Sequence, residues 1–98
     1  MTFDIRDPRS EASVAWSRNH FRILNEGGVW GIPRSGLMFR KQDGKLVCFL
    51  RMPHQPEMLE HDPPITPEQV KEQQDRDFDD VKTSFGLAGI TVEDQSNG

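Results

Sequence analysis

The sequence predicts an α+β domain in which a three-stranded antiparallel β-meander is flanked by an N-terminal and a C-terminal helix, in the order α-β-β-β-α. Two segments with helical spacing of apolar residues enclose three short β-prone runs, and a chain of 98 residues has room for one core. We expect residues 1–90 to form this single domain. Residues 91–98 are small, polar or acidic apart from Val92, and we expect them to be a disordered tail.

The first helix is expected from Asp7 to Asn25, with Asp7 as the N-cap residue and Pro8 at the first helical position. Gly27 and Gly28 then end it. At about 3.6 residues per turn, one face of this helix carries Ala12, Ala15, Trp16, Asn19 and Ile23, with His20 and Leu24 at its margin. An alternative is a strand over residues 20–24, because Phe21 and Ile23 alternate with Arg22.

Three β-prone runs follow at residues 29–33, 37–41 and 45–52, separated by turn-forming segments. Asp43-Gly44 favours a two-residue type I′ turn, which makes Gln42 face Lys45. This register pairs Phe39 with Cys48 and Leu37 with Leu50 on one face of the sheet. The other face then carries Met38, Arg40, Val47, Phe49 and Arg51, an apolar content that predicts a cover, either the N-terminal helix or a partner.

Residues 53–64 contain four prolines and predict an extended connector without regular structure, held to the domain by Met58 and Leu59. The sequence Thr66-Pro67-Glu68-Gln69 is a capping box with proline at the first position, so a helix is expected over residues 67–85. Gly86 is expected at the left-handed position after this helix, with Leu87 touching Val81. The predicted buried stripe consists of Val70, Gln74, Phe78, Val81 and Phe85.

Charge divides the chain unevenly. Residues 1–52 hold nine Lys/Arg against five Asp/Glu, whereas residues 53–98 hold three against eleven, giving +4 and −8. Either the two parts attract each other in the fold, or one of them meets a charged partner. The net charge of −4 argues against a general nucleic-acid-binding protein, which is normally basic.

Several function classes find no support in the sequence. No apolar window could span a membrane and the first residues do not form a signal peptide, so we expect a cytoplasmic protein. Cys48 is the single cysteine, and its predicted place in mid-strand makes it a buried hydrophobe rather than a nucleophile. We expect no enzyme, because the carboxylates Asp75, Asp77, Asp79 and Asp80 should scatter round a helix surface instead of converging in a cleft.

We also expect no bound metal and no other cofactor. The residues of metal-ligand type in the connector match no established spacing, and the glycines make no phosphate-binding motif. The connector residues in question are His54, Glu57, Glu60, His61 and Asp62.

Two features favour a binding function. Trp30 stands between glycines and is followed by Pro33 and Arg34, and tryptophan and arginine are common in the centres of protein interfaces. The alternative for Trp30 is a place in the core. We therefore predict a non-enzymatic protein that binds another protein through Trp30 and Arg34 or through the acidic residues Asp75, Asp79 and Asp80. The alternative function is weak binding of single-stranded nucleic acid by the sheet residues Arg40, Phe49 and Arg51.

Residues 16–21 (Trp-Ser-Arg-Asn-His-Phe), 27–36 (Gly-Gly-Val-Trp-Gly-Ile-Pro-Arg-Ser-Gly) and 66–69 resemble small uncharacterised proteins encoded by tailed phages of marine bacteria and cyanobacteria. The resemblance spans roughly two thirds of the chain. It implies a virus-encoded accessory protein, in the host cytoplasm, that binds a host or virion protein. It attaches neither an activity nor functional residues.

Overall fold

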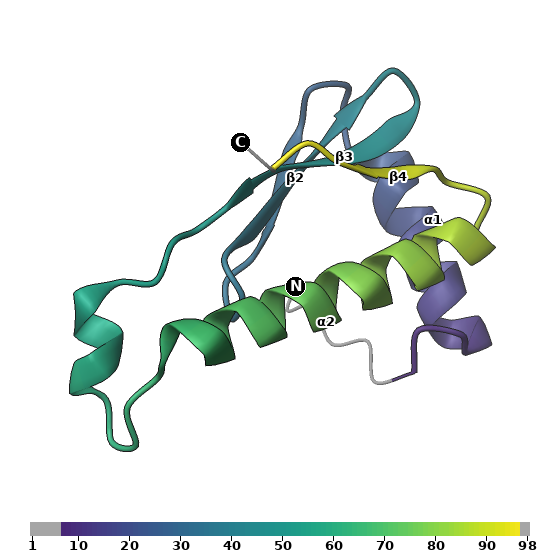
Figure 1. Ribbon diagram of the computed structural model, residues 1–98. Coiled ribbons are helices and arrows are strands. Elements are labelled where there is room, and N and C mark those ends of the chain that lie inside the picture. Colours follow the sequence, from purple (N-terminus) through teal and green to yellow (C-terminus); the bar gives the residue numbers. More distant parts are fainter. Residues whose placement is uncertain (1–6, 97–98) are drawn as a thin grey trace.

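The computed structural model describes residues 7–96 (Figure 1). The elements occur in the order α1 (Glu11–Ile23), β1 (Val29–Ile32), β2 (Leu37–Gln42), β3 (Lys45–Arg51), the 3-10 helix η1 (Pro56–Glu60), α2 (Pro67–Leu87) and β4 (Val92–Asp94). The four strands form one mixed sheet in the order β1-β2-β3-β4, with β1, β2 and β3 antiparallel and β4 parallel to β3. The expected α+β class and the meander are confirmed, but the sheet has a fourth strand.

Strand β4 shows that the expectation of a disordered tail from residue 91 was wrong. The Leu46 N–H donates to the Thr91 carbonyl at 2.9 Å, and the Gln95 N–H donates to the Cys48 carbonyl at 2.8 Å. Because α2 separates β3 from β4 along the chain, these three elements form a parallel crossover unit. Three residues with two carboxylates carry too little periodicity to reveal such a strand. Residues 97 and 98 of the predicted tail lie outside the described residues.

Helix α1 begins at Glu11 and not at Pro8, because Ser10 is the N-cap residue and accepts a hydrogen bond from the Ser13 N–H. The predicted apolar face was largely wrong, and so was the strand alternative for residues 20–24. Ala12, Ala15, Asn19 and Ile23 are exposed. The buried or half-buried residues are instead Ser13, Val14, Trp16, Ser17, His20, Phe21 and the C-cap residue Leu24. The reason is Ser17, whose hydroxyl lies 2.7 Å from that of Ser84 in α2 and is fully buried. Because both side chains are small, the two helices can approach closely at this pair. A search for periodic apolar residues does not detect a contact between two serines.

The β2–β3 hairpin follows the predicted register only in part. Gln42 pairs with Lys45 and Phe39 with Cys48, as expected from the Asp43-Gly44 turn. A bulge then leaves Phe49 without a partner, so Met38 pairs with Leu50 and Leu37 with Arg51. Past the bulge, the side chains of β3 therefore change faces relative to the prediction.

Helix α2 confirms the capping box, in which Gln69 N–H donates to the Thr66 hydroxyl and Thr66 N–H donates to the Gln69 side chain. The predicted stripe is buried or half-buried, and it also contains Asp77 and Ser84. The helix runs through Gly86 to the exposed Leu87, and Gly89 takes the left-handed conformation instead. The connector was expected to lack regular structure, yet its residues 56–60 form η1.

The core lies between the sheet and both helices, which share one side of the sheet (Figure 1). Its fully buried residues are Ile32, Leu37, Phe39, Leu46, Cys48, Val81 and Phe85. Since α1 packs on the same side as α2, it does not cover the opposite sheet face. Within the described residues, neither helix has the length and apolar character of a membrane span.

Candidate binding groove

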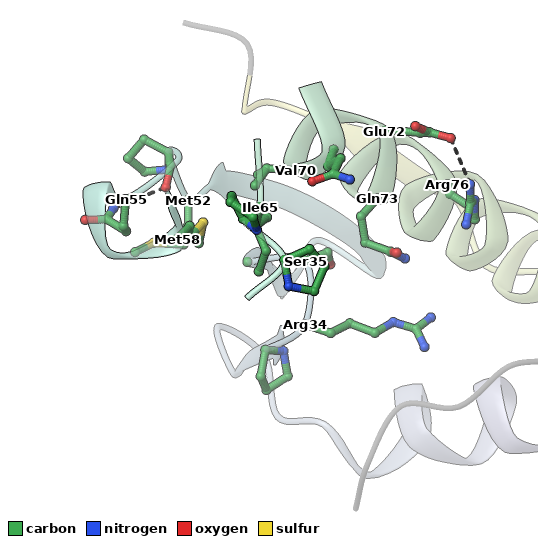
Figure 2. A pocket seen from close by; sticks show the side chains of 16 residues that line it. Arg34, Ser35, Met52, Gln55, Met58, Ile65, Val70, Glu72, Gln73 and Arg76 are labelled. Carbon is green, nitrogen blue, oxygen red and sulfur yellow. Dashed lines mark hydrogen bonds and ion pairs between the residues drawn. The ribbon is translucent and has the colours of Figure 1, made fainter. Parts of the chain in front are cut away.

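A groove of about 620 Å³ opens between the β1–β2 turn, the connector and the first half of α2 (Figure 2). Its volume is within the range of small-ligand and peptide sites. Half of its lining is apolar, with Met52, Met58, Ile65, Val70 and four prolines, and its charged lining residues are Arg34, Glu72 and Arg76.

Hydrogen bonds fix the walls of this groove. The Gln74 side chain, which is buried in α2, donates to the Ser35 carbonyl at 3.0 Å and to the Met52 carbonyl at 2.8 Å. The Ile65 N–H donates to the Met58 carbonyl at 2.8 Å, and a ring nitrogen of His54 lies 2.7 Å from the Ile65 carbonyl. The turn, the end of β3 and the connector are therefore tied to one another by hydrogen bonds within the chain.

Arg34 and Asp77 form a two-pronged ion pair beside the groove. Arg34 Nε donates to Asp77 Oδ2 at 3.0 Å, and Arg34 Nη2 donates to Oδ1 at 2.8 Å. Gln73 also donates to Oδ1, at 2.9 Å. The Asp77 side chain is 0% exposed, whereas that of Arg34 is 46% exposed. The buried carboxylate thus holds the guanidinium in one orientation at the groove wall.

This pair corrects the interpretation of Asp77 as a surface carboxylate. Asp77 lies three positions after Gln74 and four before Val81, so it belongs to the buried stripe of α2. The spacing alone would assign Asp77 to the buried stripe. Charged residues are seldom fully buried unless they are paired, and the sequence did not reveal a partner. Arg34, 43 residues away, is that partner.

The groove has an apolar end and a charged end, and Glu72 lies beside Arg76 at the charged end (Figure 2). In Figure 2, Met52 and Met58 lie toward one end, while Arg34, Gln73 and Arg76 lie toward the other. Arg76 Nη2 donates to Glu72 Oε1 at 3.0 Å, and both of these side chains are mostly exposed.

Trp30 does not line the groove; it packs against the core. Its ring stacks on Phe39 with centroids 5.2 Å apart and contacts Phe85 at 5.7 Å and His20 at 4.8 Å. His20 in turn stacks on Trp16, and its Nε2 is buried without a hydrogen-bond partner. Burial lowers the pKa of His20, so the neutral ring is favoured among these aromatic residues.

The three acidic residues predicted to bind a partner have different surroundings. Asp75 is exposed and pairs with Arg51 at 2.9 Å, and Asp79 is exposed four positions further along α2. Asp80 is half-buried, and burial together with the neighbouring Asp77 and Asp79 raises its pKa. None of the three lines the groove.

Of the three residues predicted to bind nucleic acid, the structure brings Arg40 and Phe49 together but places Arg51 elsewhere. Arg40 lies over the Phe49 ring, with its guanidinium carbon 4.8 Å from the ring centroid. Arg51 instead turns to the helix side, where it bonds to Asp75 and Asp94 and lies 5.5 Å from the Phe78 centroid. The bulge at Phe49 is the cause, because it moves Arg51 from the predicted open face to the helix side.

Cys48 is fully buried, and burial raises the pKa of its thiol, which disfavours the reactive thiolate. Across residues 7–96, no three His, Cys, Asp or Glu side chains are grouped so that they could hold a metal ion. A comparison of the chain with models of known families, with curated proteins and with solved structures finds no match.

Proposed function

We propose that this chain is a non-enzymatic binding protein whose groove receives an extended segment of another protein. The groove itself carries this proposal, because its walls are fixed by hydrogen bonds within the chain and half of its lining is apolar. Methionine side chains adapt to different apolar partners, and preformed walls reduce the entropy lost on binding.

The chemistry of the lining favours binding over catalysis. Its charged residues are Arg34, Glu72 and Arg76, and each already takes part in an ion pair. A general base needs a titratable group directed at the substrate. Guanidinium groups do not supply one, and the carboxylate of the lining, Glu72, is mostly exposed and paired with Arg76. From the resemblance to phage proteins, we propose a host or virion protein as the partner.

A library of short random peptides displayed for selection tests this proposal. Peptides selected on the wild-type protein should bind Met58→Glu at least about tenfold more weakly, because a carboxylate at the apolar end opposes burial of their side chains. Leu59→Glu is the matched control, since Leu59 is the next residue, is 53% exposed and does not line the groove.

Dissociation constants from fluorescence anisotropy measure the effect, and thermal melts establish that both variants are folded. Equal affinity for the two variants, or the selection of no peptide at all, would contradict the proposed function.

Single-stranded nucleic acid remains the second candidate ligand, supported by the stack of Arg40 on Phe49 alone. We expect no measurable binding of an oligonucleotide near physiological salt, because two residues give few phosphate and base contacts beside an acidic half-chain. Binding that survives such salt and is lost in Arg40→Ser would favour this candidate.

A further inference from the structure

We infer that the sheet face opposite the helices is a second binding surface, and that it receives a protein surface on which a carboxylate lies beside apolar side chains. Helices α1 and α2 both pack on the other side of the sheet (Figure 1). The inference concerns a different part of the molecule from the groove and goes beyond the function proposed for it.

This side of the sheet, here called the open face, carries several apolar residues. Side chains alternate between the two faces of a strand, so Met38 and Arg40 point away from the helices on either side of the core residue Phe39. Residues paired across strands share a face, which adds their partners. The apolar residues of the open face are Val29, Met38, Val47, Phe49 and Leu50.

Part of this apolar surface is exposed. Val29 is 54% and Leu50 is 41% exposed, and Met38 and Phe49 are half-buried. A sheet face that stays in water is ordinarily polar, and exposed apolar residues grouped on one surface indicate an interaction site. Since α1 does not cover this face, a partner remains as the cover that its apolar residues predict.

Arg40 gives the open face a positive charge that no carboxylate of residues 7–96 neutralises. Its guanidinium carbon lies 4.8 Å from the centroid of the Phe49 ring. The side chain forms no ion pair within residues 7–96, and its Nε is buried without a hydrogen-bond partner. The stack on Phe49 therefore holds a guanidinium whose hydrogen-bonding capacity is unused.

The neighbouring charged groups are already engaged with one another. Lys45 and Glu93, which lie on the same face, pair at 2.9 Å. Glu26 is held at the β2–β3 turn, where its Oε1 accepts a hydrogen bond from the Asp43 N–H at 2.7 Å. Arg40 is therefore the charge that an incoming partner has to complement.

A carboxylate is the protein group that matches a guanidinium best, because it accepts two parallel hydrogen bonds. Arginine and aromatic residues are also enriched in protein interfaces. An Asp or Glu beside Leu, Ile or Phe would pair with Arg40 and bury Val29 and Leu50 at the same time.

Single-stranded nucleic acid fits this face less well. Such ligands need several cations along the backbone and several rings on which bases stack. The open face offers one unpaired cation and one ring, and its other exposed or half-buried apolar residues are Val29, Met38 and Leu50.

A second copy of the chain also fits less well. In a symmetric dimer it would present the same face, on which the carboxylate of Glu93 is already paired with Lys45. It would therefore bring a second Arg40 and no free carboxylate from this face.

A displayed library of a small three-helix domain with randomised surface residues tests the inference. Clones selected on the wild-type protein that bind Met58→Glu equally well do not use the groove. Among these, we expect clones that bind Leu50→Ser at least about tenfold more weakly but Leu87→Ser within about twofold. Leu87 is the matched control, because it is a leucine of α2 that is 53% exposed.

The charge is tested by reversal. The clones that depend on Leu50 should carry Asp or Glu beside apolar residues and bind Arg40→Glu at least about tenfold more weakly. Replacing that acidic residue by Lys in one clone should restore its affinity for Arg40→Glu, which a purely structural role of Arg40 would not produce. Arg18→Glu, at an exposed arginine of α1, is the control and should leave affinity within about twofold.

Thermal melts establish that the variants are folded. The absence of clones that depend on Leu50, or clones that depend on Leu50 and bind Arg40→Glu as tightly as wild type, would overturn the inference. So would an oligonucleotide that binds near physiological salt and is lost in Arg40→Glu, or a dimer in sedimentation that is lost in Leu50→Ser. None of these outcomes affects the groove, which Met58→Glu tests separately.

Discussion

Asp77 shows how one buried side chain sets the position of an exposed one. Its carboxylate is sealed between α2 and the β1–β2 turn, and its two bonds to Arg34 connect elements that are far apart in sequence. A buried carboxylate without a positive partner is strongly unfavourable, so the pair is constrained by stability as well as by any binding role of Arg34.

Replacing Arg34 should therefore lower the free energy of unfolding more than replacing Asp77. Arg34→Gln leaves a buried carboxylate without its ion-pair partner and is expected to lower the free energy of unfolding by about 3 kcal/mol. Asp77→Asn should cost roughly 1–2 kcal/mol, because the half-exposed Arg34 can turn toward water. Urea denaturation measures both values. Arg76→Gln, which breaks an exposed pair, is the control and should stay within about 0.5 kcal/mol of wild type.

His20 should make stability depend on pH. Its folded-state pKa lies below the ordinary value of 6.5 because the ring is buried against Trp16 and Trp30. As pH falls through 6.5, the unfolded chain binds the proton before the folded chain does, so the stabilisation present above that pH is progressively lost. We expect the free energy of unfolding to decrease from pH 7 to pH 5, and to decrease less in His20→Phe. Parallel pH profiles for the two proteins would contradict this explanation.

At the scale of elements, the features that could be predicted from the sequence are those set by residues close together in the chain. The Thr66–Gln69 capping box and the Asp43-Gly44 turn placed α2 and the hairpin, because each signal lies within a few residues. The buried face of α1 was missed, because it depends on Ser17 meeting Ser84 across 67 positions. The bulge at Phe49 was missed for a similar reason, and with it the side of the sheet on which Arg51 lies.

The groove could not be predicted from patterns of neighbouring residues either. Arg34 was singled out for its residue type, but its orientation depends on Asp77, and the lining comes from three separate stretches of chain. The residue type made Arg34 a candidate. It lines the groove because the β1–β2 turn packs against α2.

Strand β4 gives a direct test at this scale. A chain truncated after Thr91 should lose roughly 2 kcal/mol of stability, because Leu46 loses its cover and Arg51 loses Asp94. A thermal melt measures the loss. Glu93→Gln, which removes only the partly exposed pair with Lys45, is the control and should be nearly neutral. If the truncated chain has the same melting temperature as the full chain, β4 does not stabilise the fold, as expected for a disordered tail.

At the scale of the whole molecule, the two oppositely charged parts of the chain meet within the fold. Within the described part of the chain, four ion pairs join residues 7–52 to residues 53–96: Arg34–Asp77, Lys45–Glu93, Arg51–Asp75 and Arg51–Asp94. The first of the two explanations for the charge division, attraction within the fold, therefore accounts for a substantial part of it.

Salt should weaken this attraction selectively. Raising the ionic strength from about 0.05 M to about 0.5 M shortens the screening length to a few ångströms, so the partly exposed pairs of Arg51 and Lys45 should contribute less. We expect a modest loss of stability, of about 1 kcal/mol or less, in urea denaturation. Arg51→Gln should show a smaller dependence on salt than wild type, and an equal dependence would contradict the role of these pairs.

The parallel crossover from β3 through α2 to β4 orders the way in which the chain folds. Hairpin β2–β3 closes through a two-residue turn, whereas β4 reaches β3 only after the connector and α2 have been placed. Closure of so long a loop costs entropy that the three short pairings of β4 cannot repay until α2 has docked. We therefore expect the sheet to be completed from its middle outward, and β4 to be the first strand that detaches when the protein opens.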